Sequence, residues 1–240
     1  AAYNNTTAGG TTAVGMQAGY ANTTGTRLTA LGLSAALQNT TGGYNTAVGY
    51  QALRSNQTGE SNVSVGENSM YYNTGNFNTA VGRTALLNNT TGSYNTAIGY
   101  RALDANTTGV NTAIGADALG GNTTGTDNVA VGGTNGVTVG AALASNTTGN
   151  YNIAIGTGAL NKSTIAGQNT AVGYQAGYNG VSSAYNALFG YNAGFSQNYA
   201  GNQHSAFFGR NSGYSNTTGL FNHAFGNNAL YSNTTANGNL

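Results

Sequence analysis

A repeat of 16 or 17 residues fills the chain of 240 residues and constrains its fold more than any other feature. The consensus reads Y-N-T-A-V-G-Y-Q-A-L-x-x-N-T-T-G-x. The glycine that closes TAVG recurs at this spacing, except that Gly140 follows Gly132 after 8 residues and Gly209 follows Gly190 after 19. Helix–turn–helix repeats need more than about 30 residues per unit, so the period excludes them.

Two short apolar stretches, TAVG and QAL, stand in each unit between Gly and the turn sequence Asn-Thr-Thr-Gly. Turn residues at this density leave room for strands of about three to five residues. We therefore expect an all-β fold: a single β-solenoid domain over residues 1–240, in which every rung contributes two short strands and two turns. Stacked rungs would lie about 4.8 Å apart.

Aligned on the closing glycine, the columns of the repeat predict which side chains face the core. The residue before that glycine is always apolar, as in Val48, Ile98 and Phe208, and is predicted to point into the core. The residue one position earlier is mostly Ala, as in Ala47 and Ala97. Because side chains alternate along a strand, this small residue should lie on the opposite face, where another backbone can approach closely.

Two further columns predict how neighbouring rungs interact. An Asn, such as Asn45, precedes most TAVG segments, and stacked Asn side chains can hydrogen-bond from rung to rung. The fourth residue after the closing glycine is usually Leu, but four rungs have a glycine followed by an aromatic residue, namely Gly19, Gly177, Gly194 and Gly213. We interpret this as a volume swap, in which the ring fills the space of the missing Leu.

The core that a single chain can build is small. Each rung offers about two large apolar side chains, whose burial gives about 5 kcal/mol, against an ordering cost of about 1.5 kcal/mol per residue. Burial of the Ala column against another copy would offset part of the difference. We therefore expect chains to associate with one another through Ala47, Ala97, Ala113 and their equivalents.

Composition excludes several classes of function. Only 5% of the residues are charged, and 6 Lys and Arg against 5 Asp and Glu give a net charge of +1. This charge leaves no electrostatic footprint for nucleic acid. No apolar run approaches the roughly 20 residues of a membrane span, so we expect no membrane insertion. The chain has no Cys, and hence no disulfide framework.

Catalytic and cofactor chemistry have weak support. Carboxylate pairs that hydrolyse glycans must converge within about 5–10 Å, and only Glu60 and Glu67 lie close in sequence. His204 and His223 stand far from every acid, so no Ser-His-Asp set is credible, and we interpret them as surface residues rather than metal ligands. We expect no enzyme activity and no cofactor. Asn-x-Thr sites such as Asn39 are explained by the turn, although glycosylation stays open.

Ice binding is an alternative in another class. Thr side chains in register on a flat sheet can order water, and the repeat contains the column Thr46, Thr79, Thr96, Thr112 and Thr170. Residues such as Val63 interrupt this column. By alternation it also shares a face with Val48, which favours the core. A self-assembling extracellular filament subunit is a further alternative.

Two irregularities mark regions of interest. Residues 132–140 cannot complete a rung, because eight extended residues span too little distance; we predict a break in the stack there, with Asn135-Gly136 at its tip. After about Gly173 the chain gains aromatic residues. Exposed rings with a polar tip suit contact with a glycan or receptor, and the candidates are Tyr174, Tyr191, Tyr199 and Tyr214.

The segments NTAVGYQAL, NTAIGYRAL and NTAVGYQAG, which begin at Asn45, Asn95 and Asn169, resemble repeats of bacteriophage tail-fibre proteins and, less closely, the head repeats of trimeric autotransporter adhesins. The resemblance covers essentially the whole chain. It implies a left-handed parallel β-roll assembled as a homotrimer. The unit is longer than the usual adhesin-head unit, so its turns must differ.

The same resemblance implies a function and a location. It predicts a non-enzymatic fibrous module, structural or adhesive, of an extracellular appendage on a virion tail or bacterial cell surface. The expected partners are copies of the chain itself and a cell-surface glycan or receptor. Because the chain stops in mid-repeat after Asn233, we expect it to be a fragment of a longer fibre.

Overall fold

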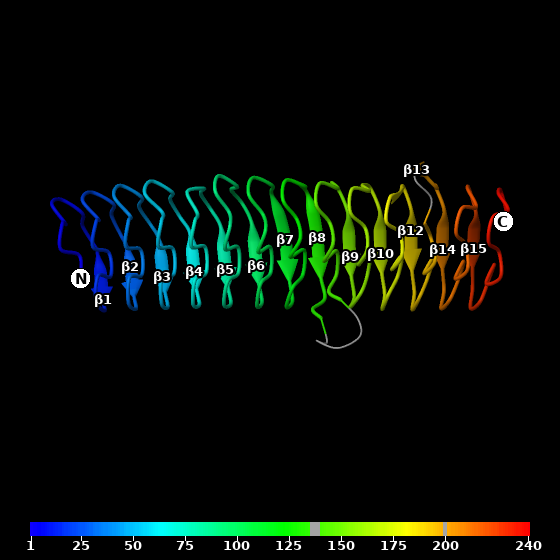
Figure 1. Ribbon diagram of the computed structural model, residues 1–240, viewed down its shortest axis with the longest axis horizontal. Helices are drawn as coiled ribbons and strands as arrows, with labels where there is room; N and C mark the ends of the chain where they lie inside the picture. The colour runs from blue at the N-terminus through cyan, green and yellow to red at the C-terminus, as the bar shows by residue number, and fades with distance from the viewer. Residues whose placement is uncertain (135–139, 199–200) are drawn as a thin grey trace. The chain divides into compact units, whose positions relative to one another are not determined.

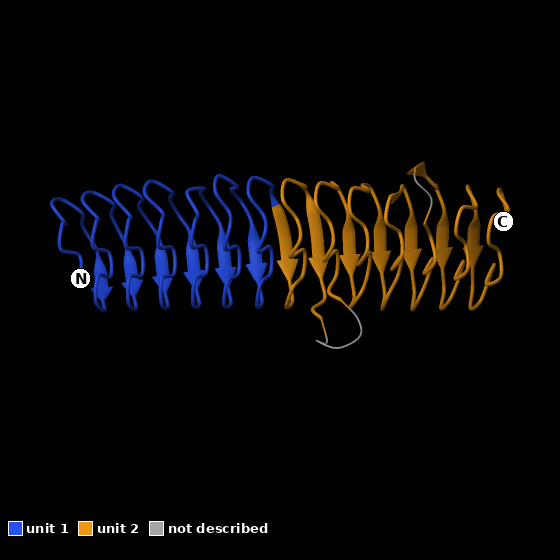
Figure 2. Cartoon of the chain, viewed as in Figure 1, with its two compact units in different colours: residues 1–110 blue, residues 111–240 orange. Residues whose placement is uncertain are grey.

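A computed structural model describes residues 1–134, 140–198 and 201–240 and shows an all-β chain in which these residues form no helix. They form two compact units, Ala1–Val110 and Asn111–Leu240 (Figure 2). Each unit is a stack of rungs whose strands run parallel in chain order (Figure 1). The predicted parallel β-solenoid is therefore confirmed. No helix among the described residues is long and apolar enough to cross a membrane.

Six strands form the sheet of the first unit. They are β1 (Thr12–Val14), β2 (Thr29–Leu31), β3 (Thr46–Val48), β4 (Val63–Val65), β5 (Thr79–Val81) and β6 (Thr96–Ile98). Each strand pairs with the same three positions of the next rung, so that Thr29 lies opposite Thr46 and Ala30 opposite Ala47. The sequence repeat is thus also the hydrogen-bonding register.

In the described part of the second unit, seven strands follow the same pattern. They are β7 (Asn111–Ile114), β8 (Asn128–Val131), β9 (Ile153–Ile155), β10 (Thr170–Val172), β12 (Ala187–Phe189), β14 (Ala206–Phe208) and β15 (His223–Phe225). A second, two-stranded sheet pairs β11 (Ser183–Ala184) with β13 (Gly201–Asn202). It belongs to the two rungs that are 19 residues apart, Ala187 lying opposite Ala206.

The irregular segment at 132–140 does not interrupt strand pairing. Ala130 of β8 lies directly opposite Ala154 of β9, in unbroken register. The rung is 24 residues long, as the bond from the Thr123 hydroxyl to the Thr147 carbonyl shows. Gly140 therefore does not close a rung of its own, and the chain here has gained residues rather than lost half a rung. The predicted tip at Asn135-Gly136 lies outside the described residues.

The QAL segment is not the second strand that the sequence predicts. Gln51 and Leu53 both have positive φ, at 54° and 53°, and the same alternation recurs at Arg101 and Leu103. Their amides still bond to neighbouring rungs: Gln51 N–H donates to the Leu33 carbonyl on one side. Left-handed residues turn the backbone too tightly for an extended strand, and this keeps the rung narrow.

The strand faces are the reverse of the sequence prediction. Ala47 and Ala97 are 0% exposed, whereas Val14 is 62% and Ile98 39% exposed. Side chains of the turn segment, such as Leu103, fill most of the narrow interior. The strand can therefore contribute only a small side chain, the methyl group of Ala. The predicted packing of chains through the Ala column is therefore wrong, because these residues lie inside their own rung.

Two ladders of buried Asn cross the interior. Asn62 donates through Nδ2 to Asn45 Oδ1 at 3.2 Å, and Asn56 donates to Asn39 Oδ1 at 2.8 Å. The predicted bonding from rung to rung is confirmed. The second ladder consists of the Asn of Asn-Thr-Thr-Gly. Asn39 and its equivalents from Asn22 to Asn216 are buried and bonded where a glycan would have to attach, whereas Asn233 at the end of the ladder is partly exposed.

Where a glycine replaces Leu in the turn, the aromatic ring that follows the glycine does not fill the space as the sequence predicts. A Cβ at Gly213 would lie 2.4 Å from the Phe207 ring, and one at Gly177 would lie 2.7 Å from Leu188. Phe207 and Leu188 occupy the Ala column and are 0% exposed. At Gly177, Gly194 and Gly213 the volume swap therefore holds, but a strand residue fills the space. At Gly19 the nearest side chain is that of Leu28, just before β2. The following aromatic ring, such as Tyr214, lies at the surface instead.

Candidate functional site

The outward face of the strands, which we call the strand face, carries the two residues on either side of the buried Ala column, such as Thr46 and Val48 beside Ala47. In the first unit these are Thr and Val or Ile in most rungs, and their side chains are partly or fully exposed. Val81 is 37% and Ile98 39% exposed. Parallel pairing in register places identical residues in straight lines. Each unit therefore presents a periodic surface of hydroxyl and apolar groups.

Aromatic residues of the second unit form ladders on its surface. Rings in consecutive rungs stack face to face with centroids 4.8–5.4 Å apart. Among the described residues of this unit the ladders are Tyr174–Tyr191, Tyr178–Phe195–Tyr214–Tyr231, Tyr185–His204–Phe221 and Phe189–Phe208–Phe225. Offset or parallel ring pairs contribute about 0.5–1.5 kcal/mol beyond the area they bury.

The candidate glycan contacts fall into separate ladders. Tyr174 and Tyr191 stack at 5.2 Å and are 37% and 47% exposed. Tyr214 stacks between Phe195 and Tyr231 in another column and is half-buried. Tyr199 lies outside the described residues. The structure thus brings two of the four residues together, and alignment by rung is the signal that identifies the pair.

The first unit stacks Arg on Tyr in the equivalent columns. The guanidinium of Arg27 lies 4.8 Å from the Tyr44 ring centre, and that of Arg54 lies 5.3 Å from the Tyr71 ring. Arg54 also donates to the Tyr71 hydroxyl at 2.8 Å. Such cation–π contacts contribute about 0.5–1 kcal/mol at exposed sites. These cations are therefore used in stacking between rungs.

The acidic residues and the histidines are scattered over the described part of the chain. Glu60 and Glu67 lie beyond opposite ends of β4, and Glu67 pairs with Arg83 at 3.6 Å. His204 is stacked between Tyr185 and Phe221. Within the described ranges no three His, Cys, Asp or Glu residues lie close enough to hold a metal ion.

Comparison with known proteins gives no relative. No family model, no curated protein and no solved structure matches this chain. Its function is therefore inferred from the repeat geometry and from the surfaces that the repeat forms.

Proposed function

We propose that this chain is a non-enzymatic fibrous module of an extracellular appendage, a phage tail fibre or a bacterial surface adhesin. In this role it associates with copies of itself and presents or contributes to binding of a host glycan or receptor. The observation that carries the proposal is the strand face, on which an apolar residue is partly or fully exposed in each described strand of the main sheet.

The strand face supports self-association because it is periodic and uncharged. Burying apolar surface contributes about 25 cal/mol per Å², and extended apolar patches on a protein surface mark interaction sites. Ile98 in the first unit and Ile114 in the second are both 39% exposed. A second copy in parallel register would set each row of Val and Ile against the same row. The homotrimer is proposed on the tail-fibre and adhesin resemblance.

Adhesion is proposed for the surface aromatic ladders. Exposed Tyr rings combine an apolar face with a hydroxyl, the combination that suits sugar rings. Tyr174 and Tyr191 present such rings side by side. The assembled fibre would repeat this pair once per chain, which strengthens weak individual contacts through multivalency.

Analytical ultracentrifugation tests the assembly. The wild-type chain of 24.0 kDa is expected to sediment at three times its mass. Ile98→Asp combined with Ile114→Asp should shift it to monomer, because each charge would be buried without a partner. The matched control is Thr91→Asp on an exposed turn. A wild-type monomer at micromolar concentration would contradict the assembly.

Incubation of the purified chain with bacterial surface polysaccharides tests the non-enzymatic part. We expect no release of oligosaccharide. Hydrolysis that disappears on Glu60→Gln or Glu67→Gln would overturn this part of the proposal.

Ice binding is a second candidate, and one observation favours it. The Thr column, expected from the sequence to face the core, lies on the outward strand face, and five of the six strands of the first unit begin with Thr. A trimer would cover this face. A monomer that shows thermal hysteresis, lost on Thr79→Lys with Thr96→Lys but kept in Thr91→Lys, would therefore favour ice binding over assembly.

A further inference from the structure

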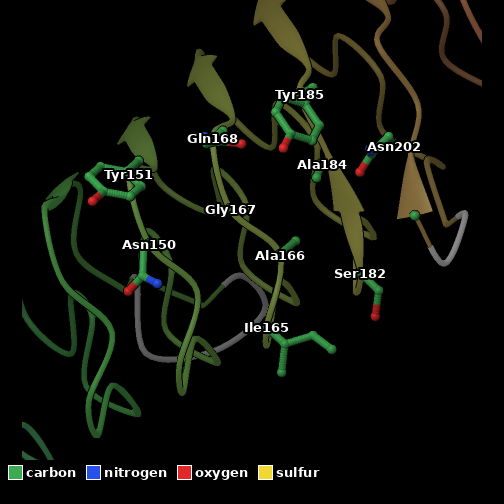
Figure 3. A pocket seen from close by; sticks show the side chains of 11 residues that line it. Asn150, Tyr151, Ile165, Ala166, Gly167, Gln168, Ser182, Ala184, Tyr185 and Asn202 are labelled. Atoms are coloured by element: carbon green, nitrogen blue, oxygen red, sulfur yellow. The ribbon is translucent and has the colours of Figure 1, made fainter.

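A groove of about 590 Å³ opens on one edge of the second unit (Figure 3). It spans four consecutive rungs and lies beside the small sheet of β11 and β13. The residues that matter to its chemistry are Asn150, Tyr151, Gln168, Ala184, Tyr185 and Asn202. We call it the Tyr151–Tyr185 groove. Its volume is within the range of small-molecule sites.

One polar column of the repeat is interrupted at the groove. The column in question stands two residues before the buried Asn that precedes each strand. In several rungs the side chain at this position accepts a hydrogen bond from a backbone N–H of the preceding rung. Asn150 Oδ1 accepts from Thr126 N–H at 2.7 Å, and Asn76 Oδ1 accepts from Glu60 N–H at 2.8 Å. Gly167 and Ala184 occupy this position in the next two rungs and have no side-chain oxygen.

The interruption concerns the backbone donors of two residues that line the groove. The N–H groups of Asn150 and Gly167 have no acceptor among the residues that the structure describes. A Cβ at Gly167 would lie 2.7 Å from the Asn150 carbonyl oxygen, so this position does not accept a side chain without a shift of the backbone. The two donors lie one rung apart, which is about 4.8 Å in stacked strands.

Two tyrosines bracket the same groove. Tyr151, Gln168 and Tyr185 occupy one column in three consecutive rungs, so the two rings lie on either side of the glutamine (Figure 3). Tyr185 is covered on its far side by His204, at 4.9 Å. The ring ladder therefore stops at Gln168, whose exposed side-chain amide has no hydrogen-bond partner within the described part of the chain.

These features match the chemistry of a neutral sugar. A pyranose offers C–H faces that stack on aromatic rings and hydroxyls that both accept and donate hydrogen bonds. The groove supplies ring faces, two free N–H donors and an amide, and its lining contains no charged residue. An anionic ligand would meet no countercharge there.

We infer that the Tyr151–Tyr185 groove is a binding site for a neutral saccharide, held by the Asn150 and Gly167 amides, Gln168 and the two rings. This inference rests on the glycan-binding part of the proposed function and gives it a location. The site is separate from the Tyr174–Tyr191 pair, which shares no lining residue with it.

Saturation-transfer NMR of the full chain with a panel of neutral oligosaccharides tests the inference. The panel contains gluco-, galacto-, manno- and N-acetylglucosamine oligomers of two to six units, together with sialylated and sulfated counterparts. Isothermal titration calorimetry then measures Kd for each sugar that responds. We expect at least one neutral oligosaccharide to bind and the acidic counterparts to bind no better.

Two substitutions close the groove with residues that the repeat uses elsewhere. Ala184→Asn restores the acceptor over the Gly167 N–H, and Gln168→Tyr completes the ring ladder. Each should weaken saccharide binding at least tenfold without loss of stability. The matched controls in the first unit are Gly43→Asn and Ser61→Tyr, at the same two columns, and these should leave Kd unchanged.

Two results would overturn the inference: no neutral sugar of the panel binds, or both groove variants bind as well as the wild type. Sedimentation of the same samples separates this from the assembly proposal. A monomeric chain that binds saccharide through the groove contradicts the trimer and supports the site. A trimer that binds no saccharide supports the assembly and contradicts the site.

Discussion

A rung around β6 in the first unit and a rung around β14 in the second unit fill their equivalent interiors with different side chains. Around β6 the strand supplies a methyl group, from Ala97, and the turn supplies Leu103. Around β14 the strand supplies a benzyl group, from Phe207, and the turn supplies Gly213. The comparison teaches that the volume inside a rung is fixed while its source is free to move between strand and turn. Interior packing at this density tolerates exchange of volume better than its gain or loss.

Breaking this complementarity should have the largest effect on stability. Phe207→Ala leaves a cavity and is expected to cost about 3–5 kcal/mol. Gly213→Leu forces a side chain into the Phe207 ring and is expected to cost about 3 kcal/mol. The double variant recreates an ordinary Ala and Leu rung, so it should recover much of the loss, with a coupling of about 2–3 kcal/mol. Urea denaturation measures all three.

The reverse exchange in the first unit sharpens the comparison. Ala97→Phe should destabilise the chain, and adding Leu103→Gly should restore part of the loss. If the losses of the single variants simply add in the double variants, for Phe207 with Gly213 and for Ala97 with Leu103, the strand and turn positions do not share one volume.

The close approach of the closing glycines should give the next largest effect. A Cβ at Gly82 would lie 2.5 Å from the Gly99 carbonyl oxygen, whereas a Cβ at Gly226, in the last complete rung, meets nothing within 4 Å. Both glycines have positive φ. Gly82→Ala should therefore cost about 2 kcal/mol more than Gly226→Ala, since only the former adds a clash to the backbone strain. Thermal unfolding of the pair checks this, and equal costs would show that φ alone requires glycine.

The Asn ladder predicts a smaller effect that also depends on the rung. Asn89 is 0% exposed and donates to Asn73 Oδ1 and to the Gly92 carbonyl. Asn89→Ala leaves buried groups unpaired and should cost about 1–3 kcal/mol. Asn233 is half-exposed at the end of its ladder, so Asn233→Ala should lower the free energy of unfolding by only about 0.5–1 kcal/mol. Denaturant midpoints give the ranking, and a larger loss at Asn233 would contradict it.

Surface stacking should give the smallest effect. Tyr191→Ala removes one partner of an exposed ring pair and should cost about 0.5–1.5 kcal/mol. Arg54→Ala removes a half-buried cation from Tyr71 in the first unit and should cost about 1 kcal/mol. A loss of several kcal/mol from Tyr191→Ala would show that the ladders support the fold rather than a binding surface.

The sequence predicts the rung and its register because both follow from one period. It does not predict which strand face is buried, because alternation separates Ala47 from Val48 without saying which points inward. The usual preference of large apolar residues for the interior gives the wrong answer here. The width of the rung decides, and that width depends on left-handed residues such as Leu53, which no residue preference indicates.

The two irregular sites differ in how far the sequence could reveal them. GVTVG, which ends at Gly140, imitates the end of a rung, so alignment alone misplaces it. Only the pairing of β8 with β9 shows that Gly140 does not close a rung. The Tyr151–Tyr185 groove leaves a readable trace: Gly167 and Ala184 interrupt a column that is polar in neighbouring rungs. Its two free donors follow from that interruption, but the volume and the bracketing rings need the structure.

The Asn ladders have a consequence for how such a chain can evolve. Most internal rungs accept from the next and donate to the one before through the same atoms, as Asn62 does with Asn45. Removing or duplicating one whole rung by recombination between repeats therefore joins a donor to an equivalent acceptor and leaves no buried amide unmatched. Length can therefore change by one whole repeat at a time at little energetic cost.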